Sequence, residues 1–387
     1  MEMNHHAPLL EIVVTARPSW ARVRSILTAY AALTSPEKCR LALVGPAVSK
    51  RYGDISRQIP DGIGFSAFPT LRDSDDLSSI ALSCIEGSEV LARHWATNRP
   101  ECALVIADRT ETLGVSLAAS LMQIPLIHLQ GGEVSGSIDD KVRDANTKLS
   151  DFHLTTNDFT RQHLLSLGES EDRIKVVGCP SLDIVKIHMQ SNKTWDPKDL
   201  NGVGQPIKAE SDYGIVMFHP DTFDEEENLL WIDLLIETIK SSSINWFWFW
   251  PNPDHGTSVI SKRMRVAREL NLLPNVQFLI NVPPDTFVMM ALRAQIMIGN
   301  SSFGIRESSF IGLPVINLGK RQAGRQRGGN VTDLLNPDST VLKQAITKNA
   351  GKRISPSNLY GDGESGFKSA NAIANWKPSL KRRFTSF

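Results

Sequence analysis

Short apolar runs alternate with amphipathic stretches along most of the chain. In the first half, the apolar runs predict strands over Leu9–Ala16, Arg40–Val44, Ala103–Ala107, Pro125–Leu129, Phe152–Thr156 and Ile174–Val177. The stretches between them predict helices over Trp20–Leu33, Leu77–Trp95, Glu111–Met122, Asp140–Leu149 and Phe159–Leu167. Continuous apolar strands separated by helices are typical of a parallel sheet that is covered on both faces.

The pattern is interrupted between about Ser191 and Ser211, in the polar stretch SNKTWDPKDLNGVGQPIKAES. This stretch contains proline and glycine and has no periodicity, so it predicts an interdomain linker. The alternation then resumes, with strands expected over Gly214–Phe218, Trp246–Trp250, Val276–Ile280, Ile296–Ile298 and Pro314–Leu318, and helices over Glu225–Lys240, Val259–Leu270, Asp285–Arg293 and Phe303–Gly312. We therefore expect two consecutive doubly wound α/β units, with ligand bound at the carboxyl ends of their strands.

Length and composition fit two globular domains. The chain has 387 residues, of which 41% are hydrophobic and 22% charged, and this excludes a fibrous or disordered protein. Because 42 basic residues balance 42 acidic ones, nothing favours nonspecific binding of nucleic acid. The first residues lack a signal-peptide pattern, and the apolar runs are far shorter than the about 20 residues of a membrane span. We expect a cytoplasmic protein without nucleic-acid or membrane partners.

The cysteines and the common catalytic motifs exclude several classes of site. Cys39, Cys84, Cys102 and Cys179 are too far apart for zinc-type pairs. Cys102 and Cys179 adjoin apolar runs and are predicted to be small buried residues. The chain contains no P-loop, HExxH or GxSxG motif. No metal or cofactor is therefore expected.

Polar residues follow two of the predicted strands in the first half. Asp108 and Arg109 come directly after one strand, although an aspartate there is equally suited to cap the next helix. After the following strand come His128, Gln130, a glycine pair and Glu133. The glycines permit either close backbone approach to a ligand or a left-handed turn. Two such loops with acidic and basic groups favour a functional site.

Asp139 and Arg143 are four residues apart on a predicted helix, and they share one face. The plain interpretation of this pair is a salt bridge on the protein surface. In the second half, His219 follows a predicted strand, where a lone histidine is more often structural. The aromatic run Trp246–Trp250 predicts a buried strand rather than a base-stacking surface.

The stretch IGNSSFGIRESSFIGLPVINLG is the second strong signal. Ser301 and Ser302 precede a predicted helix, whose N-terminus suits a phosphate, although a serine there is also an ordinary cap. Glu307, one turn further on, is suited to a ribose diol. The basic, glycine-rich GKRQAGRQRGG suits an anionic ligand or a solvated loop equally well.

Together these motifs resemble the UDP-N-acetylglucosamine 2-epimerase family, in its hydrolysing branch that feeds sialic acid synthesis. The resemblance runs from TARPSW to GKRQAGRQRGGNV, and its most specific parts are IADRTETL, GGEVSGSIDDKVRDANTKLS, FHPDT, WPNPDHG, NVPPDTF and GNSSFGIRESSFIGLPVINLG. It implies a GT-B fold of two Rossmann-like, doubly wound parallel-sheet domains with an interdomain cleft. Residues 1–190 and 211–364 would form the domains, and residues 365–387 would hold a helix crossing back to the first.

The resemblance and the strand-end motifs together imply roles for individual residues. The catalytic positions are Asp108, Asp139, His219, Gln130 and Glu133. The substrate-binding positions are Arg17, Arg109, His128, Arg143, Asn252, Val282, Ser301, Ser302, Glu307 and Arg321, with the nucleotide mainly in the second domain. This chain departs from the family pattern at Ala107 (usually glycine), Gln130 (usually glutamate) and Asp144 (usually histidine). An amide cannot accept a proton as a base, so the change at Gln130 affects the mechanism.

The implied reaction converts UDP-N-acetylglucosamine and water to N-acetylmannosamine and UDP. Anti elimination of UDP gives a glycal-like intermediate, which is then hydrated; this needs a base near C2 and donors on the diphosphate. Other hypotheses remain open: the same chemistry on a UDP-2,4-diacetamido-2,4,6-trideoxyhexose for legionaminic acid, a GT-B glycosyltransferase, or a sugar-nucleotide-binding protein without turnover. A homodimer or tetramer is expected from the family.

Overall fold

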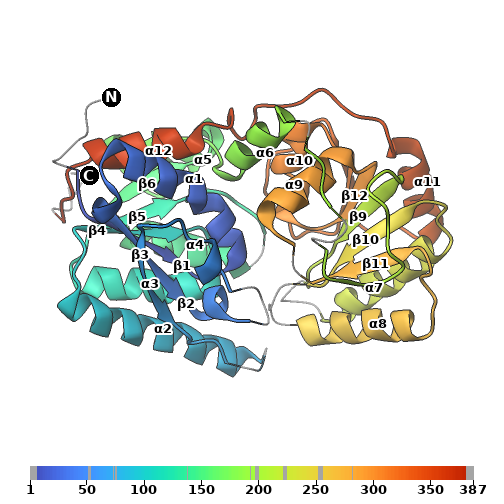
Figure 1. Cartoon of the computed structure of the whole chain (residues 1–387), viewed down its shortest axis with the longest axis horizontal. Helices are drawn as coiled ribbons and strands as arrows, with labels where there is room; N and C mark the ends of the chain where they lie inside the picture. Colours follow the sequence, from blue (N-terminus) through green and yellow to red (C-terminus); the bar gives the residue numbers. More distant parts are fainter. Residues whose placement is uncertain are drawn as a thin grey trace. The chain divides into compact units, whose positions relative to one another are not determined.

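The computed structural model describes residues 7–50, 54–72, 74, 76–136, 138–191, 193–196, 200–220, 225–251, 256–280 and 282–380. The chain divides into two compact units, each built around a seven-stranded sheet (Figure 1). The first unit takes the described residues of 1–134, 138–183 and 360–387, and the second those of 135–137 and 184–359.

The first sheet is entirely parallel, with strand order β3-β2-β1-β4-β5-β6-β7. Its strands are β1 (Leu10–Val14), β2 (Cys39–Val44), β3 (Gly64–Phe68), β4 (Cys102–Ile106), β5 (Leu126–Leu129), β6 (Phe152–Thr155) and β7 (Ile174–Val176). Its helices are α1 (Arg17–Leu33), α2 (Leu77–Thr97), α3 (Thr110–Leu121), α4 (Ile138–Leu149), α5 (Asp158–Ser166) and α12 (Ser365–Asn375), and α6 (Ser181–Met189) follows β7. The strand order reverses between β1 and β4, which makes this the topological switch point.

Successive residues of the central strands point to opposite, buried faces of this sheet. Ile12 belongs to the core under α1 and α12, whereas its neighbour Val13 belongs to the core under α2 and α3. Trp20 of α1 and Ile373 of α12 are completely buried in the first of these cores. Figure 1 shows α12, in red, lying along α1. Each such side chain stabilises the unit by about 1.5–3 kcal/mol.

In the first unit the buried His153 lies against the ion pair of Glu169 and Lys148. The Glu169 carboxylate lies 3.2 Å from His153 Nε2 and 2.8 Å from Lys148 Nζ. Burial by itself would raise the pKa of Glu169, but these two partners outweigh it and lower the pKa to about 2.

The second sheet has the order β14-β13-β12-β9-β10-β11-β8 and is parallel except for β8. Its strands are β8 (Gly202–Gly204), β9 (Tyr213–Met217), β10 (Asn245–Phe249), β11 (Val276–Leu279), β12 (Ile296–Gly299), β13 (Val315–Leu318) and β14 (Val331–Leu334). Its helices are α7 (Glu225–Lys240), α8 (Thr257–Glu269), α9 (Pro284–Arg293), α10 (Glu307–Ile311) and α11 (Ser339–Asn349). Here the switch point lies between β9 and β12.

The stretch predicted to be a linker is in fact part of the second unit. Strand β8 pairs antiparallel with β11, and the buried Trp195 packs against Tyr213 and Phe247. The linker prediction is wrong here because a three-residue edge strand needs no apolar run. The prediction for Trp246–Trp250 is confirmed, since four of its five rings are buried.

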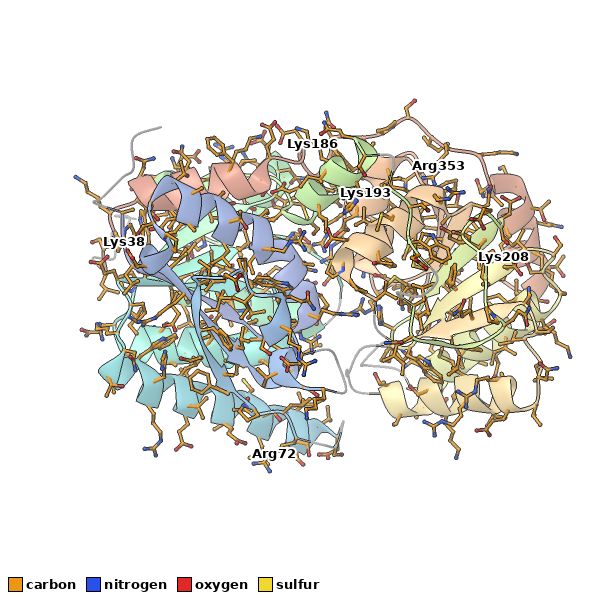
Figure 2. All side chains as sticks on the ribbon, viewed as in Figure 1. Lys38, Arg72, Lys186, Lys193, Lys208 and Arg353 are labelled. Atoms are coloured by element: carbon orange, nitrogen blue, oxygen red, sulfur yellow. The ribbon has the colours of Figure 1, made fainter. Side chains whose placement is uncertain are left out.

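Helix α9 of the second unit ends at a side-chain cap. The guanidinium of Arg353, labelled in Figure 2, donates to the carbonyl oxygens of Leu292 at 2.6 Å and Ala294 at 2.9 Å. A cation there satisfies carbonyls that have no partner within the helix. No helix in the described part of the chain is long and apolar enough to span a bilayer.

Candidate functional site

Three sequence-predicted residues follow neighbouring strands at, or one strand from, the switch point of the first sheet. Arg17 follows β1, Asp108 follows β4 and Gln130 follows β5, and these strands are consecutive neighbours in the sheet. Because all three strands are parallel, the residues lie at one edge of the sheet. Ligands bind at this edge in open α/β sheets. Burial lowers the pKa of the Arg17 guanidinium to about 10, which leaves it protonated at neutral pH.

Arg143 of α4 is the centre of a buried charge cluster. Its side chain is fully buried, and it bonds to the carboxylates of Asp108 and Asp140 and, at 2.7 Å, to the carbonyl oxygen of Glu133. Burial alone would lower the pKa of Arg143, but the surrounding carboxylates outweigh it and raise the pKa. The interpretation of Arg143 as half of a surface salt bridge is therefore wrong. The i, i+3 spacing of Asp140 and Arg143 is the signal that sequence reasoning missed.

The alternative role of Asp108 as a helix cap is not what the structure shows. The N-cap position of α3 is Arg109, and α3 has no side-chain cap. The Arg109 guanidinium instead pairs with Glu111 at 3.1 Å. The Asp108 carboxylate is directed to Arg143. Asp139 lies half-buried in the first turn of α4.

The backbone on both sides of this cluster adopts an unusual conformation. Ala107 and Gln130, at the ends of β4 and β5, have φ angles of 57° and 63°. This left-handed region costs a residue with a Cβ atom about 1–2 kcal/mol. Such backbone strain concentrates at functional sites. Two adjacent strand ends with this feature support the location of the site.

Gln130 and its neighbours are buried. Gln130 is 1% exposed, and its Nε2 donates to Cys179 Sγ at 3.2 Å. Its Oε1 has no hydrogen-bond partner in the described part of the chain. Glu133 is also buried and accepts a hydrogen bond from Thr156 Oγ1 at 3.1 Å. His128 is completely buried, with both ring nitrogens bonded to protein atoms. Cys102 and Cys179 are buried, as predicted.

The glycine pair after β5 is needed for packing within the protein. Gly132 has φ of 80°, so a left-handed turn, one of the two alternatives that the sequence left open, is present. A Cβ atom on Gly132 would lie 2.3 Å from the carbonyl oxygen of Thr160, and one on Gly131 would lie 2.7 Å from His128 Nδ1. The close approach is therefore to α5 and to His128 of the protein itself.

The switch point of the second sheet holds a comparable group. His219 follows β9, Asn300 follows β12 and Arg321 follows β13, and these strands are also neighbours. The Asn300 side chain accepts from the His219 amide and donates to the His219 carbonyl, both at 2.8 Å. Arg321 Nη1 donates to the Asn300 carbonyl at 3.3 Å. Gly299 permits this arrangement, because a Cβ atom there would lie 1.9 Å from the Met217 carbonyl. Sequence reasoning had not assigned a role to Asn300.

The single helix predicted over Phe303–Gly312 is wrong. Ser301 caps a 3₁₀ turn at Ser302–Gly304, and α10 begins only at Glu307. The buried Arg306 donates to Ser302 Oγ at 3.0 Å across the break. The phosphate argument from a long helix dipole is therefore weakened, because these helical pieces are short.

Glu307 remains a notable group in this segment. It is 5% exposed, and its Oε2 lies 3.8 Å from Arg306 Nε and makes no hydrogen bond with the residues that the structure describes. Val282, which precedes α9, is buried. Asn252 lies outside the described residues.

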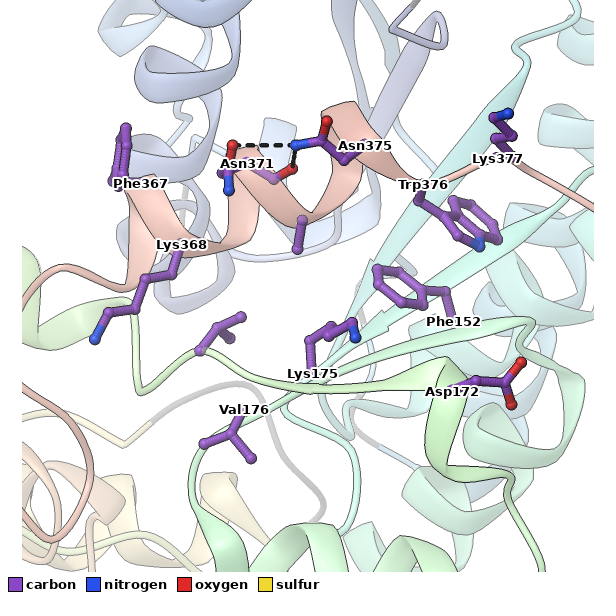
Figure 3. Close-up of a pocket in the computed structure, with 12 residues that line it drawn as sticks. Phe152, Asp172, Lys175, Val176, Phe367, Lys368, Asn371, Asn375, Trp376 and Lys377 are labelled. Carbon is purple, nitrogen blue, oxygen red and sulfur yellow. Dashed lines mark hydrogen bonds between the residues drawn. The ribbon is translucent and has the colours of Figure 1, made fainter.

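A separate hollow of about 540 Å³ opens on the first unit, beside β6, β7 and α12 (Figure 3). The rings of Phe152 and Trp376 stack at 5.0 Å on one side, and Asn375 bonds to Asn371 on the helix. Its lining contains none of the residues predicted for the site. The hollow is therefore distinct from the charge cluster around Arg143.

Two Rossmann-like units with charged and polar groups at each switch point define an α/β protein with a GT-B-like fold. The family model for UDP-N-acetylglucosamine 2-epimerase matches residues 34–374, and the chain belongs to this family. This confirms the resemblance seen in the sequence motifs.

Individual relatives agree with this assignment. The chain is 30% identical over 273 residues to a UDP-N,N'-diacetylbacillosamine 2-epimerase (hydrolyzing) of Legionella pneumophila, covering 70% of each chain. It is 28% identical over 344 residues to a GDP/UDP-N,N'-diacetylbacillosamine 2-epimerase (hydrolyzing) of Campylobacter jejuni, covering 87% of this chain and 86% of the other. The structure of Methanocaldococcus jannaschii UDP-GlcNAc 2-epimerase, in complex with UDP-GlcNAc and UDP, has a TM-score of 0.74 and 15% identity, covering 94% of this chain and 99% of the other.

Proposed function

We propose that the protein is a hydrolysing 2-epimerase that converts a UDP-2-acetamido sugar and water to UDP and the free sugar inverted at C2. The observation that carries the proposal is the Asp108 carboxylate, which is held by the buried cation Arg143 beside a strained strand end. A carboxylate fixed at the switch point has the chemistry that proton removal from C2 requires.

The reaction divides into two steps that need acid and base groups. A carboxylate, Asp108 or Asp139, removes the C2 proton while the bond from C1 to the UDP oxygen breaks, leaving a C1–C2 double bond. Water then adds its oxygen to C1, and C2 receives a proton on the opposite face. Because two proton transfers occur on different faces, two acid/base groups are required, and His219 and Glu133 are further candidates.

The nucleotide is proposed to bind to the second unit. Arg321 supplies a cation near the end of β12, and Ser301 and Ser302 supply hydroxyl groups. Among the described residues Glu307 Oε2 has no hydrogen-bond donor, and a ribose hydroxyl would provide one. The strength of UDP binding should therefore depend on Glu307.

The first candidate substrate is UDP-N-acetylglucosamine, with N-acetylmannosamine as the product. The second candidate is a UDP-2,4-diacetamido-2,4,6-trideoxyhexose, because the Legionella and Campylobacter relatives carry names for that activity. The two substrates undergo the same bond changes and differ only at C4 and C6.

The test is to incubate the protein with each UDP-sugar and to measure UDP release and the configuration of the released sugar by NMR. Release of a manno-configured sugar without an added acceptor is expected for at least one substrate. UDP release only when an acceptor sugar is added would instead identify a glycosyltransferase. No UDP release from either sugar, with binding intact, would identify a binding protein without turnover.

A further inference from the structure

The strained peptide before Asp108 is held by two buried donors. The carbonyl oxygen of Ala107 lies 2.9 Å from His128 Nε2 and 3.2 Å from Asn146 Nδ2. The His128 and Asn146 side chains are completely buried. Ala107 needs such support, because its φ of 57° is unfavourable for alanine.

The same network reaches a second carbonyl close to Asp108, that of Arg109, one residue further along the chain. Asn146 Nδ2 also donates to Thr112 Oγ1 at 2.8 Å, and Thr112 Oγ1 in turn donates to the carbonyl oxygen of Arg109 at 2.5 Å. The remaining amide atom, Asn146 Oδ1, accepts from Ser116 Oγ at 2.7 Å. Every polar atom of the Asn146 side chain is thus used.

The hydrogen-bond directions in this network are consistent. His128 Nδ1 lies 3.1 Å from Thr147 Oγ1, which donates to it if Nε2 carries the ring proton. Burial lowers the pKa of His128 to about 3, so the ring is neutral at working pH and holds one proton. That proton is best placed on Nε2, facing the Ala107 carbonyl.

One face of α4 contacts Asp108, Ala107 and His128. Arg143, Asn146 and Thr147 are spaced i, i+3 and i+4, and they form the buried side of the helix. Arg143 holds the Asp108 carboxylate, and Thr147 orients His128. Asn146 donates directly to the Ala107 carbonyl and reaches the Arg109 carbonyl through the Thr112 hydroxyl. A single rigid helix therefore fixes both the side chain and the backbone of Asp108.

We propose that Asn146, Thr112 and His128 are positioning residues, which hold the carbonyl groups of Ala107 and Arg109, the two neighbours of Asp108, so that its carboxylate meets the substrate in a fixed geometry. The role of Asp108 as a base rests on the proposed function, whereas the hydrogen bonds that fix the backbone around it do not. His128, predicted from sequence to contact substrate, acts in this account through Ala107. Loss of the network lowers turnover because the base moves, and substrate binding changes little.

The experiment compares Thr112→Val with Thr112→Ser. Valine keeps the volume and removes the hydroxyl that links Asn146 to the Arg109 carbonyl, whereas serine restores it. Thr34→Val is the matched control, because this buried hydroxyl also donates to a backbone carbonyl, that of Tyr30 at 2.7 Å, but at the end of α1 away from the site. Ser116→Ala is a milder second variant, for use if Thr112→Val does not fold.

The first measurement is steady-state UDP release from the better of the two UDP-sugars. Thr112→Val is expected to lower kcat by about 10- to 100-fold with KM within about twofold of wild type. Thr112→Ser should recover most of this loss, Ser116→Ala should show a smaller loss in the same direction, and Thr34→Val should keep the wild-type kcat. An unchanged kcat in Thr112→Val, or a loss that serine does not recover, would overturn the proposal.

The second measurement does not depend on activity. Hydrogen–deuterium exchange of the peptides covering residues 103–116 should be faster in Thr112→Val than in wild type, and unchanged in Thr34→Val. If the wild type releases no UDP, the proposed function fails, yet this measurement still decides whether the network holds the loop. Equal exchange in wild type and Thr112→Val would overturn it.

Discussion

Replacement of Gln130 by glutamate tests the position at which this chain departs from its family. The side chain is buried, its Nε2 donates to Cys179 Sγ at 3.2 Å, and no described residue donates to its Oε1. Glutamate has the same shape, so Gln130→Glu adds a carboxylate without a change in packing. Burial should raise the pKa of that carboxyl group and leave a base suited to neutral pH.

The stability cost follows from this shift in pKa. A glutamate whose pKa rises from about 4.3 when unfolded to about 6.5 when folded destabilises the protein by about 3 kcal/mol at high pH. Since the folded-state pKa is the higher one, the penalty is absent below pH ~4.3. It grows as the pH rises towards ~6.5 and is constant above that value. The Cys179 thiol can donate to the new carboxylate, which makes this figure an upper limit.

Whereas Gln130→Glu should lower the stability of the protein, it should raise its rate of turnover. A positioned general base raises the rate of a reaction by about 10²–10⁴-fold. Because Asp108 and Asp139 already supply part of this effect, we expect the rate of UDP release from UDP-N-acetylglucosamine to rise about tenfold. The assay is kcat against pH, together with urea unfolding at pH 5 and pH 8. Gln277→Glu is the control, since it makes the same change at a buried glutamine of β11. An unchanged or lower kcat, with the protein folded, would refute the reasoning.

The remaining predictions concern the two switch points and one ion pair. Asp108→Asn and Asp139→Asn should each lower kcat by about two orders of magnitude with little change in UDP affinity by calorimetry; near wild-type rates would place the acid/base groups elsewhere. Arg143→Lys should lower kcat and reduce the free energy of unfolding by about 1–3 kcal/mol, because an ammonium group cannot bond to Asp108, Asp140 and the Glu133 carbonyl at once as the guanidinium does. Urea unfolding identical to wild type would contradict this. Glu307→Ala should weaken UDP binding by about 1–3 kcal/mol, and equal affinity by calorimetry would remove it from the nucleotide site. The pKa of Glu169 is lowered to about 2, so its contribution to stability is lost as the pH falls from about 4.5 to 2. In Glu169→Gln the free energy of unfolding, followed by circular dichroism, should therefore decrease less over this pH range than in wild type. The same decrease in both proteins would show that other groups cause it.

The strands that were easiest to predict from the sequence are those with continuous apolar runs. Strands β4, β5 and β12 are buried on both faces, so their composition alone identifies them. Strand β3 was missed because it is a mostly exposed edge strand without such a run. Strand β8 was missed because its pairing with β11 depends on the tertiary fold.

The sequence pointed to a candidate site at the strand ends, but it did not indicate the contacts that the structure shows there. Asp108 and Gln130 were recognised because polar residues at strand ends are visible in the sequence. The burial of Arg143 could not be predicted, since it depends on how α4 lies against the end of β4. The network through Asn146 joins residues 30 or more positions apart, and no local pattern encodes it.

The most direct test of the proposed reaction is the isotope content at C2 of the released sugar. The protein is incubated in D2O with UDP-N-acetylglucosamine and, in parallel, with the UDP-2,4-diacetamido sugar, and the product is examined by NMR. Elimination followed by hydration predicts one deuterium at C2 of a manno-configured sugar, because the proton that returns comes from solvent. A released sugar that keeps its original C2 proton and gluco configuration would contradict the account.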